Sequence, residues 1–175
     1  MAGAYAVTVI GGDRPGIVAA VSHALFDAGC NLEDVSSTIL RGHFSMTLIV
    51  RCEEGSADDL ERQLSDATGQ TGIMVAVREV GEENLDVAPP THMLSVYGAD
   101  KPGIVFRVTE RLAQAGANVT DLNSRMIGAA DQPVYALMLE VAWPGEQDGL
   151  RRELDPLVQE LGVELSVHPI ETDLL

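Results

Sequence analysis

Short stretches of alternating apolar and polar residues predict the β-strands of the first half of the chain. The clearest lies at 44–50, where every second residue is apolar, so that one face would be buried and the other exposed. Residues 5–9, 32–40 and 73–80 are predicted as three further strands. Turn-forming residues separate these stretches, as expected for short strands in a small domain.

Two helices are predicted between these strands. Apolar residues at 17, 18, 21 and 25 follow helical spacing, Pro15 suits the first helical turn, and Gly29 ends the helix as a left-handed cap. The second helix follows Gly55, with Ser56 as the N-cap and acidic residues in its first turn.

The same pattern returns 87 residues later. Residues 7–18 match 94–105, and the four residues Ala28-Gly29-Cys30-Asn31 match 115–118. The second copy then carries four extra residues, which we expect in a surface hairpin. Its second helix contains Pro156, which should kink the helix or mark a break in it. The period is too long for a solenoid unit, so the repeat indicates duplication of a whole domain.

The order βαββαβ, present twice, predicts an α+β protein of two tandem ferredoxin-like domains. Each would have a four-stranded antiparallel sheet with both helices on one face. We expect the first domain at 1–82, an acidic, proline-containing linker at 83–91 and the second domain at 92–175. The uncovered sheet faces and edges favour pairing of the copies or a homo-oligomer such as a dimer.

Charge narrows the classes of partner. The formal net charge is −16, and both halves are acidic, with 5 basic and 14 acidic residues in 1–87 and 6 and 13 in 88–175. We therefore expect no direct nucleic-acid binding, which needs clustered lysine and arginine. The acidic residues form either a solvated surface or an acidic docking face.

The longest apolar run and the first residues of the chain bear on where in the cell the protein is located. The longest apolar run is far shorter than a membrane span, and the first residues lack a basic leader, so we expect a cytoplasmic protein with no membrane contact. Cys30 and Cys52 fit small buried or half-buried apolar positions rather than a disulfide framework.

The turns at 11–16 and 98–103 are the strongest candidates for a binding site. Each joins a strand to a helix, so free backbone N–H groups and the positive end of a helix dipole would be available to a carboxylate or phosphate. The glycines would let a ligand approach the backbone closely. Alternatively, Asp, Pro and Gly serve only the conformation of a capping turn.

Asn31 and Asn118 stand two residues beyond the helix-ending glycines. An asparagine there offers a donor and an acceptor to an amino-acid ligand. It is equally well explained as a turn residue.

We expect no enzyme activity. The four histidines do not recur between the copies and have no metal-ligand spacing, and no nucleophile motif or nucleotide-binding fingerprint is present. No metal and no cofactor is therefore expected.

The Asp-basic-Pro-Gly-Ile-Val turn, followed by a helix and Ala-Gly-x-Asn, resembles the ACT domain, a regulatory module that senses small molecules. As a tandem, the chain is similar to the glycine cleavage system transcriptional repressor family. The resemblance implies a non-enzymatic regulatory protein that binds an amino acid at domain interfaces, in transcriptional control of amino-acid metabolism. Because the sequence has no DNA-binding motif, we expect the protein to act through a protein partner. The alternative is a structural interaction module without a ligand.

The resemblance also implies which residues contact the ligand. They come from the turn and from the start of the second strand in each copy: Gly12, Asp13, Gly16, Ile17, Asn31 and Leu32, and Ala99, Asp100, Gly103, Ile104, Asn118 and Val119. Because Ala99 replaces Gly12, the two sites need not be equally competent.

Overall fold

The computed structural model describes residues 3–69, 72–81, 88–129, 131, 133–146 and 148–170. The chain divides into two compact units, 1–86 and 87–175. Most of the expected linker lies outside the described residues. Its limits, and with them the exact domain boundaries, stay predictions.

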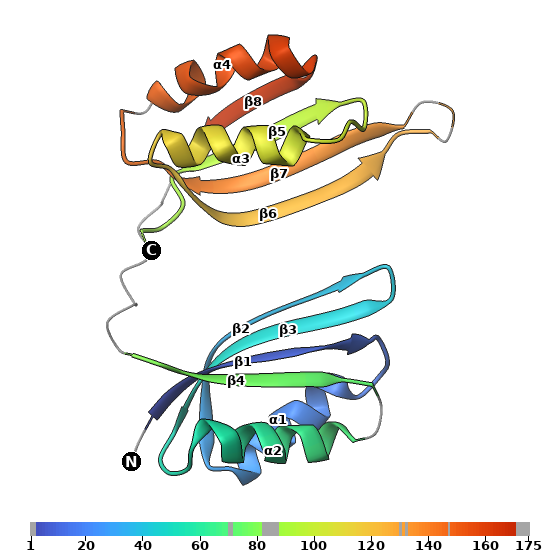
Figure 1. The fold of residues 1–175 in the computed structure, drawn as a ribbon, viewed down its shortest axis with the longest axis vertical. Helices are drawn as coiled ribbons and strands as arrows, with labels where there is room; N and C mark the ends of the chain where they lie inside the picture. The colour runs from blue at the N-terminus through green and yellow to red at the C-terminus, as the bar shows by residue number, and fades with distance from the viewer. Residues whose placement is uncertain are drawn as a thin grey trace. The chain divides into compact units, whose positions relative to one another are not determined.

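The first domain has the predicted order of elements (Figure 1). They are β1 (Gly3–Gly12), α1 (Ile17–Asp27), β2 (Cys30–Leu40), β3 (His43–Cys52), α2 (Ala57–Thr68) and β4 (Met74–Val80). The four strands form one antiparallel sheet in the order β2-β3-β1-β4.

The second domain repeats this architecture. Its elements are β5 (His92–Gly98), α3 (Ile104–Gln114), β6 (Asn118–Ile127), β7 (Val134–Ala142), α4 (Gly149–Leu161) and β8 (Glu164–Pro169). The sheet order is β6-β7-β5-β8, again antiparallel. The ferredoxin-like fold predicted for both copies is confirmed.

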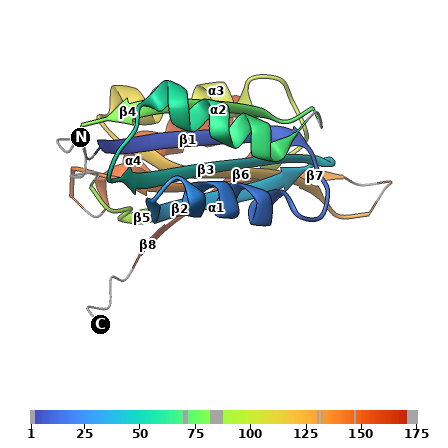
Figure 2. The same cartoon turned by 90° about the horizontal axis from the view of Figure 1, so that it is seen from below.

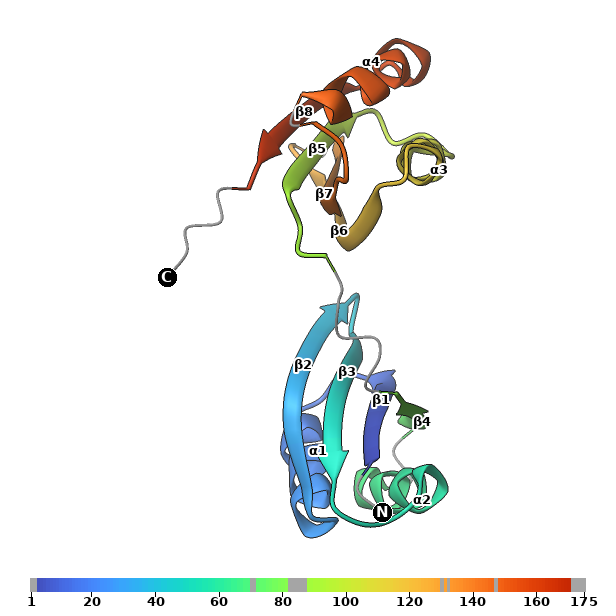
Figure 3. The same ribbon diagram turned by 90° about the vertical axis from the view of Figure 1, so that its left-hand side faces the viewer.

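Each domain has its own core between the sheet and its two helices. In the first domain α1 and α2 cover the same side of the sheet (Figure 3), and they pack side by side (Figure 2). The apolar row of β3 faces them, and its four members are almost fully buried: Phe44, Met46, Leu48 and Val50. The strand alternation therefore predicted the buried face correctly.

The helix ends agree in part with prediction. Ser56 caps α2 as expected, because its side chain accepts a hydrogen bond from the Asp59 N–H at 3.2 Å. The Ser56 hydroxyl also donates to the Asp59 carboxylate and thereby lowers the pKa of that carboxyl. Gly29 has the predicted left-handed conformation, with φ of 66°.

The two prolines agree only in part with expectation. Pro15 precedes the N-cap, Gly16, because α1 begins only at Ile17. Helix α4 runs through Pro156 without a break, so that alternative is wrong. A proline mid-helix removes one backbone hydrogen bond, and packing of Leu154 and Leu157 into the core offsets this loss.

Strands β2 and β6 are edge strands that are exposed along almost their whole length. In both, the register shifts near the start, between Leu32 and Asp34 in β2 and between Val119 and Asp121 in β6. The extra residue reverses the alternation of side chains along the strand. Within the described residues, no helix is long and apolar enough to cross a membrane.

Candidate functional site

The turn after the first strand leads into a helix that has no side-chain cap. Gly16 is the N-cap of α1, with φ of 93°, and its carbonyl accepts the first helical hydrogen bond, from Ala20 N at 2.9 Å. Gly103 does the same for α3, with φ of 95° and a bond of 2.9 Å from Arg107 N. The first N–H groups of both helices therefore carry no capping side chain, which leaves the positive end of each dipole available to an anion.

The glycines of the turn serve two separate purposes. At Gly16 and Gly103 an added Cβ would meet no other part of the protein within 4 Å, so the fold itself requires glycine there for the positive φ and not for close packing. Close approach occurs at Gly11, where a Cβ would lie 2.9 Å from the Gly72 carbonyl oxygen, and at Gly98, where it would lie 2.8 Å from Val163 Cγ1. In both domains the close neighbour of this glycine is the segment that precedes the last strand, β4 in the first domain and β8 in the second.

Replacing Gly11 by alanine is expected to lower the free energy of unfolding by about 1–3 kcal/mol, because the backbone at Gly72 must move to admit the methyl group. Gly12→Ala is the matched control. A Cβ at Gly12 meets nothing within 4 Å, and the residue has no positive φ, so a change within about 0.5 kcal/mol is expected. Urea unfolding of both variants measures the difference. Equal losses would contradict the packing at Gly11.

The freedom at Gly12 also changes the comparison of the two turns. Since alanine fits at this position, Ala99 in the second turn has no geometric consequence for the backbone. The two turns are therefore alike in backbone packing at this position, and the expected inequality of the two sites toward a ligand stays a prediction.

The basic residue of each turn has a role that the sequence did not suggest. Arg14 Nη2 donates to the Thr68 carbonyl oxygen at 3.2 Å, and Lys101 Nζ donates to the Leu161 carbonyl oxygen at 3.3 Å. Both acceptors lie at the last turn of the second helix of the domain, where carbonyl groups lack helical partners. Each side chain thus satisfies a carbonyl group at the C-terminal end of the second helix of its domain.

The two aspartates and two isoleucines of the turns differ in exposure. Asp13 and Asp100 are exposed, and the Asp13 N–H donates to the Gly42 carbonyl oxygen at 2.8 Å, which ties the turn to the β2–β3 hairpin. Ile17 and Ile104 are only 3% and 2% exposed. Their side chains belong to the cores, so only their backbone could meet a ligand.

A recess of about 540 Å³ lies beside the second turn. Its lining is mainly apolar and comes from the end of β5, the start of β7 and the α4–β8 connection: Tyr97, Gly98, Ala99, Pro133, Val134, Val158, Gly162, Val163 and Glu164. It has the size of a small-molecule site and places one carboxylate, Glu164, at its wall. Ala99 is the expected ligand residue that lines it.

The second group of expected residues lies at the other end of the domain. Cys30 pairs with Cys52, which pairs with Gly3 at the beginning of β1, whereas the turn follows Gly12 at its end. Nine strand steps, about 30 Å, separate the two ends. The structure therefore does not bring Asn31 and Leu32 together with the turn of their own domain, and the same holds for Asn118 and Val119.

The surroundings of Asn31 and Asn118 differ. Arg51 stands opposite Asn31 in the register and its Nε lies 2.7 Å from the Glu33 carboxylate, forming an ion pair. Ala142 takes the place of Arg51 opposite Asn118. The two copies are thus chemically unequal at this end, a difference that emerges only once the strands are paired.

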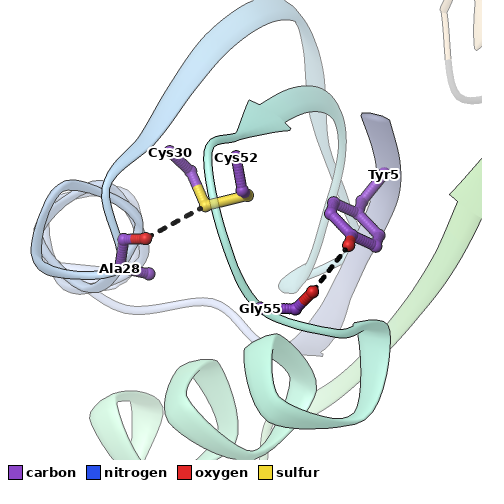
Figure 4. The surroundings of a disulfide bond; sticks show 5 residues. All are labelled: Tyr5, Ala28, Cys30, Cys52 and Gly55. Atoms are coloured by element: carbon purple, nitrogen blue, oxygen red, sulfur yellow. Dashed lines mark hydrogen bonds between the residues drawn. A yellow bond between two sulfur atoms is a disulfide. The ribbon is translucent and has the colours of Figure 1, made fainter. Parts of the chain in front are cut away.

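The expectation for the cysteines is wrong. Cys30 and Cys52 form a disulfide, in which the Cα atoms are 4.0 Å apart (Figure 4). The bond joins directly opposite residues of β2 and β3, next to Asn31. Tyr5 lies nearby and donates a hydrogen bond from its hydroxyl to the Gly55 carbonyl at 3.3 Å.

Each domain is thus a ferredoxin-like unit that opens with a strand, a glycine-capped turn and a helix, which is the arrangement of ACT domains. The ACT domain family model matches residues 6–78 and 91–168. The chain belongs to the ACT domain family, with two copies of the domain.

Relatives of known sequence differ in how much of their own length the match covers. The UPF0237 protein of Methanopyrus kandleri is 43% identical over 74 residues, which cover 41% of this chain and 82% of that protein. The glycine cleavage system transcriptional repressor of Escherichia coli is 22% identical over 135 residues, 77% of this chain and 71% of the repressor. The phosphoserine phosphatase of Mycobacterium tuberculosis is 28% identical over 141 residues, but these make up only 34% of the phosphatase.

Two of the similar solved structures match nearly the whole chain. A protein of unknown function from Galdieria sulphuraria superposes with a TM-score of 0.83 at 26% identity, covering 97% of this chain and 99% of its own. A putative glycine cleavage system transcriptional repressor gives 0.75 at 22% identity, with coverages of 97% and 98%. The tandem fold is therefore shared along the full length of these proteins.

Proposed function

We propose that this protein is a non-enzymatic regulator that binds an amino acid where the turn of one ACT domain meets the start of the second strand of another. The observation that carries the proposal is the separation of the candidate residues. The turn and Asn31 lie at opposite ends of one domain, so a site that uses both requires a second ACT domain, such as one supplied by another copy in a homo-oligomer.

The chemistry of the two halves fits an amino acid. The uncapped N–H groups that follow Gly16 and Gly103 suit its carboxylate. The exposed carboxylates of Asp13 and Asp100 suit its ammonium group. The side-chain amides of Asn31 and Asn118 provide a donor and an acceptor at the other half.

A protein partner is the proposed target of the regulation. The net charge of −16 opposes binding to a phosphate backbone, so control of transcription would pass through such a partner in the cytoplasm. The similarity to the glycine cleavage system transcriptional repressor supports a role in amino-acid metabolism.

Thermal unfolding in the presence of each of the twenty amino acids tests the proposal. A ligand at one hundred times its Kd is expected to raise the free energy of unfolding of the protein that binds it by about 2.7 kcal/mol. Asn31→Ala and Asn118→Ala should reduce the shift, while Thr38→Ala, another exposed residue of β2, should leave it unchanged. No shift with any amino acid, glycine and serine included, would contradict ligand sensing.

One observation favours the alternative of an interaction module without a ligand. The second half of β2 is an unpaired sheet edge with exposed apolar side chains, including Val35, Ile39 and Leu40, the last 65% exposed. Edges of this kind are normally covered. The alternative predicts a stable protein complex that forms equally well with and without amino acids, and a pull-down in both conditions distinguishes the two.

A further inference from the structure

The disulfide is confined to the first domain. Cys30 and Cys52 are the only two cysteines of the chain, and Ala117 holds the place of Cys30 in the second copy. Two domains with the same fold therefore differ in one covalent bond, which shows that the fold does not need it. A bond that the fold does not require, in a protein expected in a reducing compartment, is typical of redox sensing.

The position of the bond determines what it controls. It joins the first residue of the edge strand β2 to its partner in β3, immediately after α1 and Gly29 (Figure 4). Strand ends at a sheet edge open more readily than central strands, because the ladder holds them from one side only. The bond thus fixes the segment that carries Asn31 and Leu32.

The two cysteine residues differ in exposure. Cys52 is only 2% exposed, whereas Cys30 is partly exposed. A thiolate of an external dithiol can therefore attack Cys30 Sγ, and the S–S bond breaks with its electron pair on Cys52 Sγ, which takes up a proton. The second thiol of the dithiol then attacks the mixed disulfide and releases Cys30. The protein pair gains two electrons, and the dithiol becomes a disulfide.

We propose that Cys30–Cys52 is a reversible thiol–disulfide switch that exchanges with dithiol–disulfide couples and controls the order of the first residues of β2. Its effect on ligand binding rests on the proposed function, since it assumes that Asn31 contacts the amino acid. The oxidised form holds Asn31 in place before the ligand binds. It therefore binds the ligand more tightly, because less conformational entropy is lost on binding.

Amide hydrogen exchange of the full chain tests the switch without any ligand. After reduction with dithiothreitol, exchange at residues 30–33 is expected to become about tenfold faster, because local opening of the strand end is easier, and reoxidation with oxidised glutathione should restore the slow rate. Residues 118–121 of the second domain, which have no cysteine, are the internal control and should not change. Equal rates at 30–33 in the two states, or failure to reoxidise, would overturn the switch.

A binding measurement tests the coupling. Glycine and serine are titrated into the oxidised protein, the reduced protein and the Cys30→Ser/Cys52→Ala variant, with a severalfold weaker Kd expected in the last two. Equal affinity in all three would overturn the coupling even if exchange changes. Absence of binding in every state, if it extends to all twenty amino acids, would refute the proposed function, and the exchange experiment would still decide the switch.

Discussion

Replacing Leu48 by alanine is expected to lower the free energy of unfolding of the first domain by about 3 kcal/mol. Leu48 lies in the interior strand β3, is 1% exposed and faces both helices. Its truncation removes buried methyl groups and leaves a cavity that the surrounding packing fills only partly. Urea unfolding followed by circular dichroism measures the loss.

Two further variants make this test specific. Thr47→Ala alters the neighbouring exposed residue on the opposite sheet face and should change stability by no more than about 0.5 kcal/mol. Leu139 holds the place of Leu48 in the second core, and Trp143, the only tryptophan of the chain, packs against that core and provides a fluorescence signal. Leu139→Ala should match Leu48→Ala, and a loss below about 1 kcal/mol in either would contradict the two packed cores.

Reduction of the disulfide is expected to destabilise the first domain by about 3 kcal/mol. The bond closes a loop with a sequence separation of 22, and opening this loop returns conformational freedom to the unfolded chain. Stabilities of ordinary domains are about 5–15 kcal/mol, so the reduced domain should remain folded.

The measurement compares urea unfolding with and without dithiothreitol. A Cys30→Ala/Cys52→Ala variant serves as the control, because its stability should not respond to the reductant. If the wild-type protein is equally insensitive, the disulfide contributes nothing to stability and its role at the start of β2 is not mechanical.

The sequence was sufficient to predict the fold because each element has a local signal and the duplication supplies each signal twice. The buried row of β3 follows from strict alternation, and Ser56 is recognisable as a cap from its position before two acidic residues. Of the two outcomes expected at Pro156, the break in the helix is wrong, because tertiary packing overrides the local rule. Pro156 lies within α4 because the core residues on both sides of it hold the helix together.

The candidate site could not be assembled from the sequence, because its residues are close in the chain but distant in the domain. Only fifteen positions separate Gly16 and Asn31, yet α1 carries the chain back to the opposite end of the sheet. The Cys30–Cys52 contact and the Asn31–Arg51 pairing depend on the register between β2 and β3, which a bulge at the start of β2 shifts. No periodicity predicts a shift of this kind.

The contacts of Arg14 and Lys101 have a mechanical consequence. Each side chain reaches from the turn to a carbonyl oxygen in the last turn of the other helix of its domain. A displacement of the turn therefore distorts or breaks this hydrogen bond. A ligand that moves the turn is therefore expected to alter the domain surface at two places, the turn itself and the end of the other helix. In each domain one hydrogen bond thus couples the turn to a helix end that lies more than fifty residues away in the chain.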